Sequence, residues 1–336
     1  MSVSHLAYGL RIEANIPLPS LTAQSKQQAV DVRIQLKDSE EFLSEFPDAS
    51  SDFCYSSVNS DAAGQLNLRV RMLAGGKYYG FFYGDGARFA VERGGREIRG
   101  DWPRDYSLED ACTYLIGPVM AFALRLRGLT CLHASAIAID NHAIALMGVP
   151  GSGKSTTATA FAKMGFPVLS DDVVVLTDGR DSLLVQPGYP RLNLWPDSVR
   201  ELFGSEDALP RITPTWDKRY LQLDPDGRYR FQASPLRLGG VYILGDRETG
   251  LTAPEIEDVT GNGALMLLLA NGYGNYLLND EMQKRDLEVL SRVADQVPVR
   301  RVRPPDRPSK VYALCEAIAS NARETSRNRM GCPANA

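Results

Sequence analysis

The sequence predicts a protein of the α/β class, in which a small β-rich domain precedes a larger domain with a mixed sheet. Two observations support this prediction. Residues 1–105 hold short alternating or aromatic runs separated by Gly, Asp and Asn turn signals. From residue 129 onward, apolar strands and helical segments surround the glycine-rich stretch GVPGSGKST at 148–156. We therefore expect domains at 1–105 and 129–323, a linking helix at 106–128 and a disordered tail at 324–336.

The composition is ordinary for a soluble chain. Its 336 residues are 44% apolar and 23% charged, enough for two hydrophobic cores. A formal charge of -4 and no lysine-rich block argue against nucleic acid as a partner. The sequence opens without a signal-peptide pattern, and no apolar run reaches about 18 residues. We expect a cytoplasmic protein with no membrane partner.

Cysteine-based metal or disulfide chemistry is not expected. The five cysteines are scattered, odd in number and without paired spacing, so buried free thiols are predicted. The chain has only three histidines, which makes a histidine near a phosphate-binding loop notable.

The β-rich domain and the linking helix follow from local patterns. Strands are predicted by four segments, 31–36, 66–73, 78–86 and 87–95. The segment 107–127 opens with a Ser cap and an acidic first turn, and it is apolar on most faces. We expect a buried helix that is interrupted near Gly117-Pro118.

The second domain begins with a predicted antiparallel hairpin, 132–140 and 143–148, because only two residues separate two apolar strands. A helix at 155–164 ends at Gly165. Short strands are predicted at 167–170, 173–177, 183–187, 219–223 and 238–244. Helices are predicted at 196–203, 263–270, 280–293 and 308–322.

The glycine-rich loop matches the pattern G-x-x-x-x-G-K-[ST] between a strand and a helix, the context that this pattern requires. Inward-facing backbone N–H groups, the helix N-terminus and Lys154 would hold phosphates, and the hydroxyl of Ser155 would ligate magnesium. The alternative is a glycine-rich turn that matches by chance. The predicted nucleotide-binding residues of the loop are Gly148, Pro150, Gly151, Ser152, Gly153, Lys154, Ser155 and Thr156.

Two further groups are predicted to lie at this loop. Folding the hairpin brings His133 opposite Val149 or Pro150; the alternative is a core histidine. If 167–170 pairs in parallel with 143–148, Asp171 and Asp172 emerge at the carboxyl end of the sheet. One carboxylate would then hold magnesium and the other would accept the proton of an attacking hydroxyl. The alternative is an Asp pair that caps a turn.

His133, the hairpin, the loop and the SDD sequence, in that order, resemble the catalytic domain of HPr kinase/phosphorylase, a bacterial serine kinase related in fold to phosphoenolpyruvate carboxykinase. The resemblance covers about Leu132 to Leu194. It implies that Asp171 is the general base, that His133 hydrogen-bonds and tunes it, and that Asp172 and Ser155 serve Mg²⁺. Lys154 would bind phosphate, and ATP is the implied donor. The family's metal-binding glutamate has no counterpart in 185–199, and the phosphorylase segment is not recognisable.

Most of the chain resembles the HPr kinase-like proteins encoded with lasso-peptide and other ribosomal-peptide pathways. The shared features include the opening YGLRIEANIPLPSL, LHASAIAI, PRLNLWPD and DKRYLQL. This resemblance implies phosphorylation of a serine at the C-terminus of a precursor peptide. The β-rich domain would recognise the peptide or mediate homo-oligomerisation.

Three cationic residues that follow the loop are candidates to bind the phosphate oxygens. Arg191 and Lys218 are predicted to bind the nucleotide, and Arg219 is predicted to be catalytic. The alternative for the Lys-Arg pair is a solvated surface position. The segment 204–216 could close as a lid. Trp195 is expected to pack in the core beside the start of the next helix, and the alternative is stacking on the nucleotide base.

The sequence thus predicts an ATP- and Mg²⁺-dependent kinase that acts on a serine of a peptide or protein. Two alternatives stay open: an ATP-dependent switch or chaperone that transfers no phosphoryl group, and a small-metabolite kinase.

Overall fold

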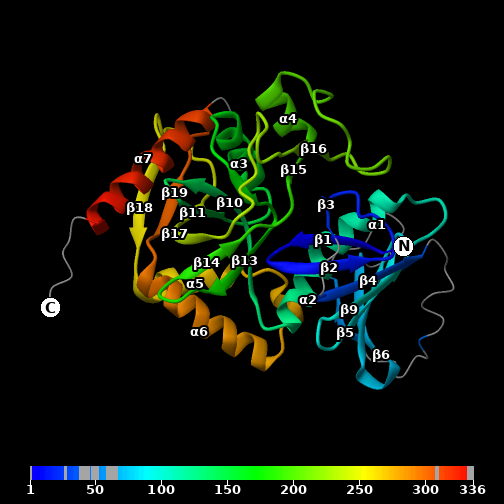
Figure 1. Ribbon diagram of the computed structural model, residues 1–336. Coiled ribbons are helices and arrows are strands. Elements are labelled where there is room, and N and C mark those ends of the chain that lie inside the picture. Colours follow the sequence, from blue (N-terminus) through cyan, green and yellow to red (C-terminus); the bar gives the residue numbers. More distant parts are fainter. Residues whose placement is uncertain are drawn as a thin grey trace. The chain divides into compact units, whose positions relative to one another are not determined.

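The computed structural model describes residues 2–25, 29–37, 46, 53–57, 67–306 and 310–330 (Figure 1). The chain forms two compact units. The first comprises Met1–Leu129 with two short later segments, Ile212–Trp216 and Gly274–Lys284. The second comprises Thr130–Arg211, Asp217–Tyr273 and Arg285–Ala336. The chain therefore leaves the second unit twice and returns to it each time.

The first unit is built on a mixed sheet. In the described residues it has nine strands in the order β3-β1-β2-β4-β9-β8-β7-β6-β5. The pairs β2–β4 and β4–β9 are parallel, and the other pairs are antiparallel. Val32, Ile34 and Leu36 of β4 are buried and alternate with exposed residues, the pattern of a strand with one face on a core. The bounds are β1 Val3–Ala7, β2 Leu10–Ala14, β3 Ala23–Gln24, β4 Val32–Lys37, β5 Phe53–Ser56, β6 Leu68–Leu73, β7 Tyr78–Tyr83, β8 Arg88–Glu92 and β9 Glu97–Asp101.

The predicted helix of this unit is present with its interruption. Helix α1 (Leu108–Tyr114) and helix α2 (Met120–Leu126) flank a π-helical turn at Leu115–Val119. Ser107 caps α1 in a capping box with Asp110. Pro118 lies in the wide turn, where its missing N–H removes one helical hydrogen bond. Short 3₁₀ turns lie at Ala74–Gly76 and Asn275–Leu277.

Aromatic rings fix the two later segments within the first unit. Tyr276 stacks on Tyr55 with ring centroids 4.2 Å apart, and Trp216 meets Tyr114 edge-on at 5.7 Å. The hydroxyl of Thr215 also donates to the carboxylate of Asp110. Aromatic pairs of this kind contribute about 0.5–1.5 kcal/mol beyond their buried area.

The second unit contains an eight-stranded sheet among its described residues. The order is β11-β10-β13-β14-β17-β19-β18, with β12 paired to β10, and β11 also pairs with β17. The β11–β17 pairing closes a ring through β10, β13 and β14. A separate hairpin-like pair joins β15 to β16. The bounds are β10 Thr130–Ile139, β11 His142–Met147, β12 Val168–Ser170, β13 Val173–Asp178, β14 Leu183–Gln186, β15 Arg191–Leu194, β16 Arg219–Gln222, β17 Leu236–Leu244, β18 Glu255–Val259 and β19 Val299–Arg303.

Helices cover both faces of this sheet (Figure 1). Ile137 and Ile139 of β10 join a core with α3 and α7, whereas Ala136 and Ala138 join a second core with α5 and α6. This division follows from the two-residue period of a strand. The bounds are α3 Lys154–Lys163, α4 Pro196–Phe203, α5 Gly261–Ala270, α6 Asp280–Gln296 and α7 Val311–Met330.

The predicted hairpin is confirmed. Strands β10 and β11 pair antiparallel from Ile139↔His142 to Ala134↔Met147. Continuing this register places His133 opposite Gly148, one residue before the predicted position. Asp140 and Asn141 form the turn with positive φ values of 47° and 61°, which Asn and Asp tolerate.

Two predictions about the second unit were wrong. The strand 168–170 pairs antiparallel with β10 and not parallel with β11, because β10 is long enough to pair with β11 on one edge and with β12 and β13 on the other. The predicted disorder at 324–330 is also absent, since α7 extends to Met330. Thr325 accounts for part of this extension: its hydroxyl donates to Asn321 O, and Arg300 donates to the same hydroxyl at 2.8 Å. Residues 307–309 and 331–336 lie outside the described residues.

Strands β1, β2, β3, β5, β9, β15, β18 and β19 were not predicted individually. In the part of the chain that the structure describes, no helix has the length and apolarity needed to cross a membrane. Of the cysteines in that part, Cys54 is exposed, and Cys112, Cys131 and Cys315 are buried free thiols.

Candidate active site

The glycine-rich loop lies between β11 and α3, as its sequence context requires. Gly148 has a φ of 146°, and a Cβ there would lie 2.6 Å from both Leu244 O and Ser152 Oγ. Gly153 caps α3 with a φ of 90°. Both positions favour glycine because other residues rarely adopt such backbone angles. The loop therefore presents the N-terminus of α3, a position that suits anions.

Lys154 folds back over this loop. Its Nζ donates to Gly148 O at 2.8 Å and to Val149 O at 3.1 Å, and the residue is 7% exposed. Burial lowers the pKa of Lys154, while the charges of Asp172 and Asp171 oppose that effect. The ammonium is thus held at the mouth of the loop beside two acidic groups.

Asp171 is a buried carboxylate that is already saturated with hydrogen bonds. Its Oδ1 accepts from Ser135 Oγ at 2.6 Å and from Ser155 Oγ at 2.9 Å, and its Oδ2 accepts from Asn193 N at 3.1 Å. The residue is 1% exposed. Burial raises the pKa of Asp171, and the hydrogen bonds, led by the one from Ser135, work against that rise. Asp171 therefore holds the hydroxyl of Ser155 in a fixed orientation by accepting its hydrogen bond.

Asp172 is the carboxylate that faces the cavity. Its Oδ1 lies 3.3 Å from His133 Nε2, and its Oδ2 accepts from the Tyr273 hydroxyl at 3.1 Å. Its side chain is 41% exposed. Burial alone would raise the pKa of Asp172, but the hydrogen bond and charge of His133, the charge of Lys218 and the hydrogen bond of Tyr273 outweigh it, so the pKa is lowered.

The expectation that His133 hydrogen-bonds Asp171 is therefore wrong. His133 pairs with Val173 in the β10–β13 ladder, which places its ring beside the residue just before Val173. Asp172 has a φ of 67°, a left-handed conformation that separates the direction of its side chain from that of Asp171. The adjacent carboxylates consequently face different surroundings, one buried and one at the cavity.

Asp172, His133 and Lys154 line a cavity of about 360 Å³, whereas Asp171 does not. One wall is the loop and the start of α3, including Gly151, Lys154 and Ser155. His133 and Asp172 also line the cavity. The remaining lining residues include Asn193, Leu194, Trp195, Ser198 and Lys218. A volume in this range falls within that of small-molecule sites, about 300–1,000 Å³.

Some predicted site residues do not reach this cavity. Gly148, Ser152, Asp171, Arg191 and Arg219 are not among its lining residues, whereas Pro150, Gly153, Thr156 and Lys218 are. Arg219 is 2% exposed and donates to Asp217 Oδ1 at 2.9 Å and to Asp207 Oδ1 at 3.3 Å. Arg191 lies 3.9 Å above the ring of Tyr220.

Alternation along the chain explains why Lys218 and Arg219 separate: neighbouring residues of an extended segment point to opposite sides. Lys218 turns to the cavity, where its Nζ lies 4.9 Å from the ring centroid of Trp195. The prediction that Trp195 packs in the core was wrong, since the residue is 59% exposed. The aromatic ring instead forms part of the rim of the cavity.

Tyr273 is a site residue that the sequence did not reveal. It lies 101 residues from Asp172, after α5, and its ring meets that of His133 edge-on at 5.6 Å. The backbone bridge Leu132↔Gly272 brings this turn beside β10. No local pattern signals such a long-range contact.

The donor set fits Mg²⁺. The predicted metal ligands Ser155 and Asp172 both line the cavity and carry hard oxygen atoms, and Mg²⁺ is usually held by one or two such groups together with phosphates and waters. The Ser155 hydroxyl is held in place by Asp171 Oδ1 at 2.9 Å. A cage of three or more His, Cys, Asp or Glu side chains is not present among the described residues.

Fold and site together define an α/β protein with a glycine-rich loop at a helix N-terminus and an acid–imidazole pair in the same cavity. No family model matches the chain. Over 65 residues, 19% of this chain, it is 42% identical to the dephospho-CoA kinases of Salmonella typhimurium and Salmonella paratyphi A. It is 40% identical to that of Salmonella choleraesuis over 65 residues. The chain spans about a quarter of the length of these curated relatives, 27%.

A solved structure, the HPr(Ser) kinase/phosphatase from Coxiella burnetii, aligns with a TM-score of 0.32 and 13% sequence identity. The alignment covers 60% of this chain and 93% of that chain.

Proposed function

We propose that this protein is an ATP-dependent kinase that transfers the γ-phosphoryl group to a hydroxyl, specifically to a serine of a peptide or protein. One observation carries the proposal: the His133–Asp172 pair lines the same cavity as Lys154 and Ser155. A phosphate-binding loop alone would suit any nucleotide-binding protein. An ionised carboxylate at the same cavity adds the base that transfer to an alcohol requires.

In this proposal Asp172, and not Asp171, is the general base. Asp172 takes the proton of the acceptor hydroxyl as the acceptor oxygen bonds to the γ-phosphorus. The bond between that phosphorus and the bridging β–γ oxygen breaks, and ADP leaves. The hydrogen bonds from His133 and Tyr273 orient the carboxylate and keep it ionised. Asp171 is unsuited to this role because its oxygens are buried and engaged by Ser135, Ser155 and Asn193.

Lys154 and Lys218 supply positive charge. Both line the cavity, and the charges of both act on Asp172, so a phosphoryl group bound there would lie near two cations. The Ser155 hydroxyl would ligate Mg²⁺, which neutralises charge on the phosphate oxygens when it is bound. The Asp171 carboxylate fixes the Ser155 hydroxyl by accepting its proton in a hydrogen bond, which leaves the hydroxyl's lone pairs for the metal.

The acceptor proposed first is a serine at the C-terminus of a lasso-peptide precursor. The resemblance of the sequence to kinases of such pathways supports it. The cavity adds a second argument, because Trp195 offers an exposed aromatic surface and Lys218 an ammonium beside it. The aromatic surface would contact a side chain near the C-terminus of the peptide, and the ammonium would pair with the terminal carboxylate.

The test is intact-mass analysis of precursor-type peptides after incubation with the protein, ATP and Mg²⁺. A gain of one phosphoryl group that disappears when the terminal serine is replaced by alanine supports the proposal. Lys154→Ala should lose both nucleotide binding and transfer, whereas Lys284→Ala, an exposed lysine of α6, should retain both. Hydrolysis of ATP with every peptide unmodified would refute peptide phosphorylation and favour a nucleotide switch.

A second candidate is a kinase for a small molecule that bears a hydroxyl. The similarity to the dephospho-CoA kinases over 65 residues favours it. A competition assay in which dephospho-CoA and a serine-terminated peptide are offered together distinguishes the two proposed functions. Label transferred to dephospho-CoA alone would replace the first proposal with the second.

A further inference from the structure

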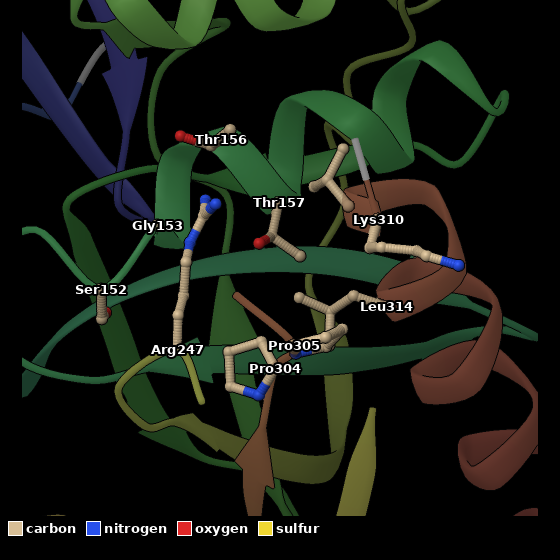
Figure 2. A pocket seen from close by; sticks show the side chains of 10 residues that line it. Ser152, Gly153, Thr156, Thr157, Arg247, Pro304, Pro305, Lys310 and Leu314 are labelled. Atoms are coloured by element: carbon tan, nitrogen blue, oxygen red, sulfur yellow. The ribbon is translucent and has the colours of Figure 1, made fainter. Parts of the chain in front are cut away.

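A second cleft lies beside the start of α3. It is lined by residues of the loop and of α3, by Arg247, and by the region between β19 and α7 (Figure 2). Gly153 and Thr156 line both this cleft and the active-site cavity. The two spaces therefore meet at the N-terminus of α3, where the loop would hold phosphates.

The cleft combines an apolar floor with polar groups near the loop. Pro304, Pro305, Val311 and Leu314 are buried and supply the apolar surface. The Oγ atom of Ser152 is buried without a hydrogen-bond partner in the described part of the chain. Such a surface suits a ligand that is flat and apolar on its faces but polar at its edges.

Arg247 gives the cleft its charged wall. Figure 2 shows its side chain extended toward Gly153 and Thr156, whereas the side chain of Lys310 points away from it. Arg247 is exposed, and its charge acts on the carboxyl of Glu201 in α4. Burial raises the pKa of Glu201, and the positive charge of Arg247 opposes part of that rise. Oε1 of Glu201 is buried and has no partner among the described residues. Glu201 thus attracts the guanidinium toward the α3–α4 side of the cleft.

We propose that this cleft is the nucleoside subsite, in which the planar guanidinium of Arg247 lies against the nucleobase and Pro304 and Pro305 contact its other face. The proposal rests on the proposed function, because it places the base of the ATP whose phosphates the loop would bind. A nucleotide that enters with its terminal phosphate toward Asp172 extends past Gly153 and Thr156, the residues that the two spaces share. Arginine suits this role because its guanidinium is planar and stacks on aromatic surfaces.

The cleft is narrow, with free room of about 20 Å³, roughly that of one water molecule. A base therefore enters only if the exposed side chain of Arg247 swings outward and then closes over it. This movement is available to Arg247 because its side chain is long and exposed. Arg247 would thus order upon nucleotide binding.

The test compares calorimetric binding of ATP with that of inorganic tripolyphosphate, which carries the phosphates without the nucleoside. The full-length protein, Arg247→Ala, Arg247→Lys and the control Arg180→Ala, an exposed arginine away from both spaces, are compared. We expect Arg247→Ala to weaken ATP binding by about tenfold and to leave tripolyphosphate binding unchanged. Arg247→Lys should lose nearly as much, because lysine keeps the charge but not the planar surface. Arg180→Ala should match the parent for both ligands.

Three results would overturn the subsite. Equal weakening of both ligands by Arg247→Ala would make Arg247 a phosphate ligand, and unchanged ATP binding would remove it from the site. Equal affinity of the parent protein for ATP and tripolyphosphate would show that no nucleoside subsite exists. Each of these leaves the kinase proposal standing, whereas a parent protein that binds neither ligand would refute both proposals.

Discussion

His133 Nε2 lies 3.3 Å from Oδ1 of Asp172, and the preceding carboxylate, Asp171, is engaged instead by two serine hydroxyls and a backbone N–H. Two adjacent acidic residues thus have separate surroundings. This division assigns the proton-accepting role to Asp172 and a supporting role to Asp171, and it can be tested residue by residue.

Replacement of Asp172 by asparagine should reduce phosphoryl transfer by at least about a hundredfold, because the amide cannot accept the proton of the acceptor. Nucleotide affinity should stay within a few-fold of the parent value, since the loop and Lys154 are unchanged. Rapid-quench measurement of a single turnover, together with calorimetric titration of ATP, separates these effects. Retention of the parent turnover rate in Asp172→Asn would remove Asp172 as the base.

Asp171→Asn should change the dependence on Mg²⁺ rather than remove the base. The carboxylate fixes the hydroxyl of Ser155 at 2.9 Å, and an amide would hold that hydroxyl less well and without negative charge. We expect the Mg²⁺ concentration for half-maximal rate to rise by about tenfold or more, with part of the maximal rate recovered at saturating Mg²⁺. A rate loss that no Mg²⁺ concentration relieves would contradict this assignment.

Tyr273→Phe should shift the acidic side of the pH–rate profile to higher pH. A base acts as a carboxylate, so activity is present above its pKa and disappears as the pH falls through it. The Tyr273 hydroxyl stabilises the charged form of Asp172 and so lowers its pKa; without that hydroxyl the pKa rises. The measurement is kcat/KM against pH. Tyr276→Phe is the matched control, because Tyr276 stacks on Tyr55 in the first unit, and its profile should coincide with that of the parent.

Gly148→Ala should destabilise the fold more than Gly151→Ala. Both glycines have positive φ values, 146° and 87°, so each substitution strains the backbone by roughly 1–3 kcal/mol. Only at Gly148 would the new Cβ also meet Leu244 O and Ser152 Oγ at 2.6 Å, whereas nothing lies within 4 Å at Gly151. Urea denaturation followed by circular dichroism measures the difference. Equal losses of stability would show that the backbone around Gly148 adapts.

The sequence predicted best the features that depend on neighbouring residues. The two-residue turn fixed the hairpin, and Pro196 at the first turn with Gly204 at the end fixed helix α4 at 196–203. The bounds of α3 follow from the loop in the same way. Such elements need only local hydrogen bonds and local backbone preferences.

Features that depend on distant residues were not predictable in this way. His133 contacts Asp172 and not Asp171 because Asp172 has a left-handed φ and because the β10–β13 register places His133 beside it. The approach of Tyr273 depends on a turn 101 residues away. Strand β19 was not predicted; three of its five residues are arginines, and in the structure Arg303 pairs with Glu255 and Glu257 of β18.

The two excursions of the chain, Ile212–Trp216 and Gly274–Lys284, have a practical consequence for dissecting the protein. One ends two residues before Lys218, which lines the cavity, and the other begins directly after Tyr273, which donates a hydrogen bond to Asp172. A polypeptide of residues 130–336 would contain Trp216 and Tyr276 without Tyr114 and Tyr55 to stack against, and one of residues 1–129 would have the opposite pair unpartnered. The halves are therefore interlaced, and neither is a natural unit for separate expression.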